Sequence, residues 1–354
     1  MQFLGVIEGW VNRHFSNEEA IFLVVLLFIL FGLLALFGNL LAPVLSGLVL
    51  AFLMQGLVAR LIAWHVPRIG AVYLTFMVFV GVVTGLLLFL FPLVSRQLTQ
   101  LVSSIPELLE RLQTVIRSLP ETFPEFIDPD QVEIWVGLIS GQIGDYGRSL
   151  LETTVTQLPS LVGWLIYLVL VPISVFFFLK DGSLIMRWFS SLLPVDRPLL
   201  NQVGAEMSVQ IANYVRGKVI EIFIVGAISY SSFAFLDLDY AALLGILVGV
   251  SVLIPFVGAA IVTLPVLLVG FLQWGWNVDL FTLFIVYSII QALDGNVLVP
   301  LLFSEAVDLH PIAIIVAVLF FGGIWGFWGV FFAIPLATLV KAIMNAWPQL
   351  EEGA

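Results

Sequence analysis

Asp294 is the residue that most directly suggests chemistry, because it lies inside a long apolar stretch, Leu280–Phe303. Tyr287 and Gln291 precede it at helical spacing, so the three side chains share one stripe of a helix. A carboxylate within hydrocarbon is costly unless it is paired, hydrated or protonated, and it usually faces a cavity. The stripe predicts a proton or cation site, or an anchor for a polar solute. The alternative is a structural carboxylate that accepts hydrogen bonds from backbone N–H groups at a hairpin end.

Glu221 is the second candidate, near the start of the apolar stretch Val219–Leu236. Lys218 lies one helical turn before it, so the spacing favours an ion pair at the membrane surface. A place in an ion or solute pathway is the alternative interpretation. We also include Asn296, which follows Asp294 closely, among the pathway candidates.

The motifs of hydrolases, ATP-driven pumps and metal sites are missing from the sequence. It has no cysteine, which excludes thiolate zinc sites and iron–sulfur clusters. Gly217-Lys218 is followed by Val219 rather than Ser or Thr, so a phosphate-binding loop is incomplete. The three histidines are far apart, in no ligand spacing: His14, His65 and His310. We therefore expect no enzyme, catalytic residue, metal site or cofactor, and any uphill transport must use a partner or an ion gradient, with H⁺ or Na⁺ as the coupling ion.

The composition places this chain in a membrane. Apolar residues make up 61% of it and charged residues only 10%. Soluble proteins average about 45–50% and about 25%, respectively. The net charge of −11 also argues against a nucleic-acid partner, which needs a basic surface. The expected partners are the lipid bilayer and a small polar solute or monovalent cation.

Six stretches are long enough to cross a bilayer, which requires about 20 apolar residues in a helix. They are Ala20–Phe37, Leu40–Trp64, Ala71–Val94, Leu158–Leu179, Val219–Leu236 and Leu280–Phe303. The predicted fold class is therefore an all-α polytopic membrane protein with six full transmembrane helices.

Two further apolar stretches, Tyr240–Leu272 and Leu309–Val340, are too long for one crossing and are interrupted near the middle. Their halves of about 11–15 residues favour re-entrant helical hairpins over pairs of short, steep spans. The residues expected at the turns are Pro255 and Gly258 in the first stretch and Gly322, Gly326, Gly329 and Pro335 in the second.

The basic residues predict the orientation, because short cytoplasmic loops are enriched in Lys and Arg. With both termini placed in the cytoplasm, nine of the 13 basic residues fall on that side: Arg13, Arg60, Arg68, Lys180, Arg187, Arg197, Arg216, Lys218 and Lys341. Residues 95–157 form the one substantial polar region. Its apolar residues recur at helical spacing, which predicts a small extracytoplasmic region of amphipathic helices.

The order of these elements suggests that one part of the chain is a transport unit and the rest supports it. A full span followed by a broken segment occurs twice in residues 219–342, in opposite directions, which is typical of transporters whose site lies between opposed hairpins. We expect this unit to enclose a polar chamber beside Asp294. The remaining parts are residues 1–94, a three-helix scaffold; 95–157, the extracytoplasmic region; 158–218, the fourth span and interfacial helices; and 343–354, a cytoplasmic tail.

Several motifs in the chain resemble the autoinducer-2 exporter family, most closely its PerM-like branch of permeases. They are Leu179–Gly182, Asn213–Lys218, Ile254–Gly258, Gln291–Asn296 with the run to Pro300, and Gly322–Ala337. The resemblance implies a multi-pass protein of the bacterial inner membrane that forms homo-oligomers. It also implies export of autoinducer-2 or Na⁺(Li⁺)/H⁺ antiport, since different relatives have been assigned these functions.

We therefore expect a secondary transporter that exports a small polar solute and is coupled to an ion gradient. Asp294 would be its ion-responsive group. The second hypothesis is a Na⁺(Li⁺)/H⁺ antiporter. The third, from a different class, is an oligomeric envelope scaffold that transports nothing.

Overall fold

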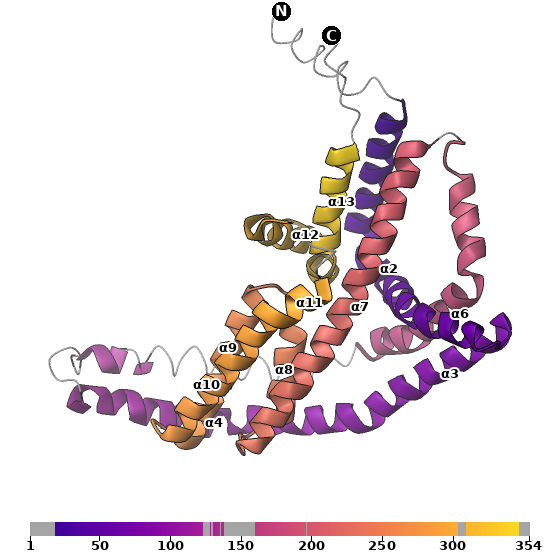
Figure 1. The fold of residues 1–354 in the computed structure, drawn as a ribbon. Coiled ribbons are helices and arrows are strands. Elements are labelled where there is room, and N and C mark those ends of the chain that lie inside the picture. The colour runs from indigo at the N-terminus through magenta and orange to yellow at the C-terminus, as the bar shows by residue number, and fades with distance from the viewer. Residues whose placement is uncertain are drawn as a thin grey trace, which may run out of the picture.

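The protein is a bundle of long apolar helices (Figure 1). The computed structural model describes residues 18–122, 128, 130–134, 136–137, 160–195, 197–303 and 309–346. None of these residues lies in a strand, and eight segments among them are long and apolar enough to cross a membrane. The predicted all-α polytopic membrane fold is confirmed. Most of the second amphipathic helix expected in the polar region, and the tail from residue 347, lie outside the described residues.

Helix α2 contains both of the first two expected spans, since Ile21–Gly38 and Leu40–Ala63 are each long and apolar enough to cross a membrane, but the junction between them at Gly38-Asn39 is not a loop. The helix has 46 residues, Glu18–Ala63, and its backbone is helical through that junction. One glycine weakens a helix without ending it. Gly38 serves packing instead of a turn, because a Cβ atom there would overlap the indole ring of Trp325.

The next three elements form one long helical rod, which runs along the bottom of Figure 1. They are α3 (Arg68–Gly85), the π-helical turn η1 (Leu86–Leu90) and α4 (Phe91–Thr122). The rod continues through Pro106 and Pro120, which lie inside α4.

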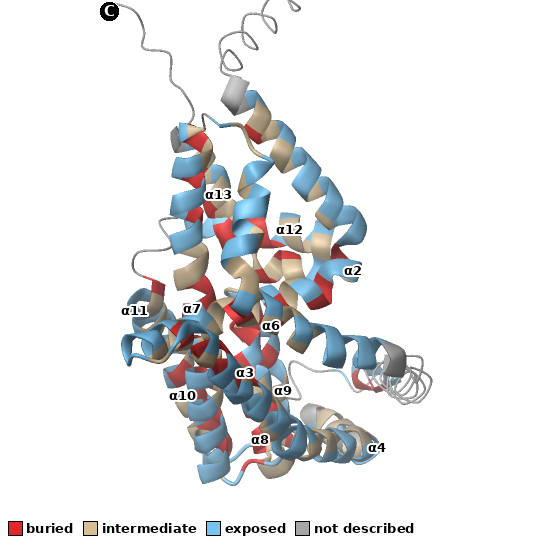
Figure 2. Cartoon of the chain, turned by 90° about the vertical axis from the view of Figure 1, so that its right-hand side faces the viewer, coloured by how far each residue is buried: buried red, intermediate tan, exposed pale blue. Residues whose placement is uncertain are grey.

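Helices α2, α3 and α6 (Ser160–Ser191) share one apolar core. Its buried members are Ala51, Val58, Ala71, Val72, Phe79, Val175 and Leu179. The outer faces of these helices carry large exposed apolar side chains, among them Phe28, Leu36 and Phe89, each at least 77% exposed. Figure 2 shows buried residues in red on the faces where helices meet and exposed residues in pale blue on the outer faces. Lipid is the environment that such outer faces require.

The C-terminal half is organised around α7 (Pro198–Phe235), the long diagonal helix of Figure 1. The other elements are α8 (Ala241–Ser251), α9 (Val257–Trp274), α10 (Val278–Leu293), the π-helical turn η2 (Asp294–Leu298), α11 (Val299–Phe303), α12 (Pro311–Phe331) and α13 (Ala333–Ala346). Helix α7 contacts α8, α10, η2, α11 and α13, and also α2.

Both broken segments fold back on themselves. Between α8 and α9 the chain turns at Phe256, whose φ is +62°, and a Cβ atom on Gly258 would overlap the carbonyl oxygen of Ser251. In the second segment Gly326 has φ +59° and ψ −134°, which interrupts α12 near its end. A Cβ atom on Gly329 would overlap the carbonyl oxygen of Phe321. Only glycine permits these close backbone approaches.

Two expectations about the broken segments need adjustment. Helix α9, with 18 residues, is longer than the predicted halves, whereas the part of α12 before Gly326, residues 311–325, agrees with them; both α9 and the whole of α12 meet the length needed for a crossing. Pro335 lies in the first turn of α13 and not at the interruption. A proline fits in a first turn because the backbone N–H groups there have no hydrogen-bond partner within the helix.

Small residues bring α7 and α8 into close contact. A Cβ atom on Gly249 would lie 2.8 Å from the carbonyl oxygen of Ile222 and 2.9 Å from the Cα atom of Gly226. Gly245, one turn earlier, approaches Tyr230 equally closely. This four-residue spacing of glycines is a common way to pack helices in membranes.

Substituting Gly249→Ala should lower the thermal unfolding midpoint in detergent, because the added methyl group forces the two backbones apart at a cost of about 1–3 kcal/mol. Gly81→Ala is the matched control, since no neighbouring atom lies within 4 Å of the position that its methyl group would occupy. That variant should be as stable as the parent or more stable, because alanine favours helix. Equal midpoints for the two variants would contradict the close packing.

Candidate functional site

A buried ion pair lies in the middle of α7. The Nζ atom of Lys218 is 2.8 Å from Oε2 of Glu221, and the two residues are 4% and 1% exposed. The pair expected from the spacing is therefore formed, but it is buried inside the protein and not at the membrane surface. The difference arises because α7 is covered by other helices along this part of its length.

The ammonium group of Lys218 has two further partners. It donates a hydrogen bond of 2.8 Å to the carbonyl oxygen of Val252, and it lies 5.2 Å from the centre of the Phe303 ring. Val252 directly follows the last residue of α8. The end of a helix leaves carbonyl groups without internal partners and carries negative potential. The first break therefore supplies an acceptor to a buried cation.

Gly217 makes room for the aromatic partner. A Cβ atom at this position would lie 2.6 Å from Cε1 of Phe303. The sequence Gly217-Lys218 therefore belongs to this packing arrangement and not to a phosphate-binding loop.

Asp294 adds a second carboxylate to this region. It begins the π-helical turn η2, which packs against α7, and its charge interacts with both Lys218 and Glu221. Its Oδ1 atom is buried and has no hydrogen-bond partner among the described residues. The site thus combines one cation with two carboxylates, and one carboxylate oxygen is left unsatisfied. Turns of π-helix often occur at functional sites.

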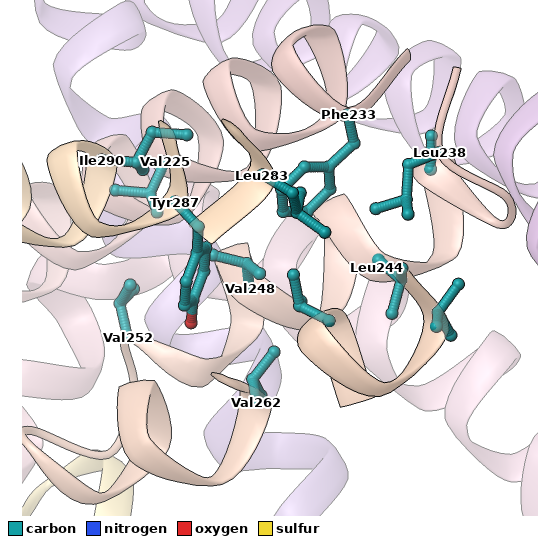
Figure 3. Close-up of a cluster of buried hydrophobic side chains, with 13 residues drawn as sticks. Val225, Phe233, Leu238, Leu244, Val248, Val252, Val262, Leu283, Tyr287 and Ile290 are labelled. Carbon is teal, nitrogen blue, oxygen red and sulfur yellow. The ribbon is translucent and has the colours of Figure 1, made fainter. Parts of the chain in front are cut away.

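Tyr287 and Gln291 extend the stripe of Asp294 towards the first break. Tyr287 is 2% exposed, and its hydroxyl group donates to the carbonyl oxygen of Ala259 and accepts from Thr263, each at 3.3 Å. Figure 3 shows this hydroxyl pointing between Val252 and Val262, within the largest apolar cluster. The Nε2 atom of Gln291 is buried and has no hydrogen-bond partner among the described residues. Tyr287 of the predicted stripe therefore faces α9, whereas Asp294 lies on a turn that packs against α7.

Asn296 does not join these groups. Its side chain is exposed and donates a hydrogen bond of 2.9 Å to the carbonyl oxygen of Ala292 in its own helix.

Tyr214 is a site residue that the sequence analysis missed. It is 2% exposed, and its hydroxyl group has no hydrogen-bond partner among the described residues. Its ring packs against Phe303 and Phe331, with centroids 5.8 and 6.1 Å away. The spacing of Tyr214, Lys218 and Glu221 repeats that of Tyr287, Gln291 and Asp294. The same stripe rule applied to α7 would have found it.

The two interruptions meet, but the space between them is apolar. A cavity of about 270 Å³ lies between the first break, at Ile254 and Gly258, and the second, at Phe327 and Phe331. Ser251 is the only polar residue among the described residues that line it. The expected polar chamber between the hairpins is therefore not found there. The polar groups lie beside this cavity, on α7 and η2, because the turns themselves carry apolar side chains.

Comparison with known proteins assigns the family. A family model described as "AI-2E family transporter" matches residues 21–349. The chain belongs to this family. It is 43% identical to PerM of Escherichia coli K12, which carries the name of a permease, over 98% of both chains. It is 26% identical to YueF of Bacillus subtilis, named as a transport protein, over 93% of this chain and 92% of that one.

A more distant relative is named for a solute. TqsA of Escherichia coli K12, an AI-2 transport protein by name, is 23% identical over 87% of this chain and 86% of its own length. The family is thus one of bacterial multi-pass permeases and transporters rather than enzymes. The names of these three relatives give no support to the antiporter hypothesis.

The substitution Lys218→Met should lower the free energy of unfolding by about 3–5 kcal/mol, because it leaves the Glu221 carboxylate buried without its partner. The double variant Lys218→Met/Glu221→Met should recover part of this loss. The measurement is reversible unfolding in mixed micelles, analysed as a double-mutant cycle.

Arg117→Met is the control for this cycle. It removes the exposed ion pair with Glu133, whose charged atoms are 3.7 Å apart, and should cost no more than about 1 kcal/mol. If Lys218→Met proved as harmless as this control, the Lys218–Glu221 pair would not be buried.

Proposed function

We propose that this protein is a secondary transporter that exports a small polar solute at the expense of an ion gradient, with Lys218, Glu221 and Asp294 as its charged centre. The single observation that carries the proposal is the unsatisfied, buried Oδ1 atom of Asp294 beside an ion pair that is already complete. In hydrocarbon such a group usually marks a pathway for an ion or a solute.

Charge balance supports coupling to H⁺ or Na⁺. When both carboxylates are ionised, Lys218 compensates only one of them, and a net negative charge remains in a poorly hydrated region. A proton or a sodium ion at Asp294 would neutralise it. Binding of this ion would therefore be linked to the state of the Lys218–Glu221 pair, since the three charges interact.

The hydrogen bond between Lys218 and Val252 offers a route from ion binding to movement. It joins the charged centre on α7 to the turn between α8 and α9. An ion at Asp294 would alter the balance of charges around Lys218 and so strengthen or weaken the hydrogen bond from Lys218 to Val252. The broken segments could then shift against α7. Alternating access would follow from two arrangements of these parts.

The name of TqsA suggests the type of solute. We propose a small polar molecule similar to autoinducer-2. The protein would act in the bacterial inner membrane as a homo-oligomer, with both termini in the cytoplasm, as the distribution of basic residues predicts.

The substitution Asp294→Asn should abolish gradient-driven solute flux, with at least a tenfold loss of initial rate, because the amide cannot bind a proton or compensate a cation. The measurement is flux of autoinducer-2 in proteoliposomes with an imposed proton or sodium gradient. Asp279→Asn is the matched control, because Asp279 is an exposed carboxylate at the other end of the same helix. Full flux in Asp294→Asn would contradict the role of Asp294, and a parent protein that moves no solute or ion would favour the scaffold hypothesis.

A further inference from the structure

A second polar site lies at the far end of α7. A pocket of about 620 Å³ opens between α4 and the connection from α7 to α8. This volume falls within the range of about 300–1,000 Å³ that is usual for small-molecule sites. Its polar lining residues include Gln97, Gln100, Ser104, Tyr230, Asp239 and Tyr240. Tyr230 lies twelve residues after Lys218, so the pocket is about 18 Å along the helix from the charged centre.

The walls of this pocket are fixed by hydrogen bonds between α4 and the connection. The Oε1 atom of Gln97 accepts a bond of 2.8 Å from the backbone N–H of Leu243, in the first turn of α8. The hydroxyl groups of Ser104 and Tyr240 are 3.1 Å apart and share another bond. Gln273 bonds both the N–H of Asp239 and the carbonyl of Asp237, each at 2.8 Å. These hydrogen bonds therefore fix the position of the residues that surround the pocket.

The backbone of the connection is also unusual. Tyr240 has φ +57° and Asp237 has φ +53°. For a bulky residue such as tyrosine the left-handed conformation is a rare outlier, and such strain is concentrated at functional sites. In this conformation the ring of Tyr240 lines the pocket and its hydroxyl group reaches Ser104.

Three polar groups on the pocket wall are free to bind a ligand. Within the part of the chain that the structure describes, the side-chain amide of Gln100, the hydroxyl of Tyr230 and the carboxylate of Asp239 make no hydrogen bond or ion pair. They lie on α4, on α7 and on the connection, so they surround the pocket. An amide and a phenol both donate and accept hydrogen bonds, and a carboxylate accepts two.

We propose that this pocket binds a neutral, polyhydroxylated small molecule. Each hydroxyl group of such a ligand donates and accepts, which matches the three free groups. Among the described residues that line the pocket there is no Lys or Arg to compensate an anion. An organic cation would meet one carboxylate but also amide and hydroxyl donors that it cannot use. The inference deepens the proposed function, on which it rests, by naming the solute class and a binding site outside the charged centre.

Ligand-observed NMR on the full chain in nanodiscs tests this proposal, with ribitol and D-ribose as probes and choline and sulfate as comparison ligands. Ribitol and ribose should bind, while choline and sulfate should not. Asp239→Ala and Gln100→Leu should each raise the dissociation constant for ribitol at least tenfold, because each removes a group that bonds the ligand. Both side chains are exposed, so both variants should fold.

Two control variants separate this site from the charged centre. Asp279→Ala removes an exposed carboxylate outside the pocket and should leave ribitol binding unchanged. Asp294→Asn should also bind ribitol normally, even though its flux is lost. Absence of ribitol binding, preference for choline, unchanged affinity in Asp239→Ala, or loss of binding in Asp294→Asn would each overturn the proposal. Retained ribitol binding in a parent protein that transports nothing would contradict only the proposed function.

Discussion

The burial of the Lys218 ammonium group is the constraint on which the C-terminal half depends. A charge in a poorly hydrated interior needs close partners, because the cost of leaving it unpaired is comparable to a large part of the stability of a domain. Here the partners come from three separate elements: Glu221 on α7, the carbonyl of Val252 after α8, and the ring of Phe303 on α11. The end of α8 is thus joined to the ion pair by the hydrogen bond from Lys218 to Val252.

The two broken segments are apolar, whereas the charged centre of Lys218, Glu221 and Asp294 beside them is polar. Their turns are apolar and enclose a small apolar cavity, and their glycines allow backbones to touch. The polar groups lie instead on two helical stripes, one on α7 and one on α10 and η2. Under the proposed function, a centre held by a few charge-dependent contacts next to packed turns is suited to switching between two arrangements, since packed interfaces change in discrete steps.

The sequence alone was sufficient for the all-α membrane fold, because apolar length and helical period are local properties. It also indicated the pairing of Lys218 with Glu221. It could not show that this pair is buried, because burial depends on which helices cover α7. The close approach of Gly38 to Trp325 could not be predicted for a similar reason, since it joins residues far apart in the chain. Tyr214 has the same spacing from Lys218 and Glu221 as Tyr287 has from Gln291 and Asp294, so the pattern was present in the sequence, but its burial against Phe303 and Phe331 depends on helices far apart in the chain.

The most direct test of the central claim is the accessibility of Ser251, whose side chain is buried beside Val252 at the end of α8. The chain has no cysteine, so Ser251→Cys introduces a single thiol of nearly the same size. Its reaction with a membrane-impermeant maleimide is measured in sealed vesicles of uniform orientation under proton gradients of opposite direction. The account predicts labelling at least tenfold faster under one gradient than under the other. Equal rates under both would contradict it and indicate a static core.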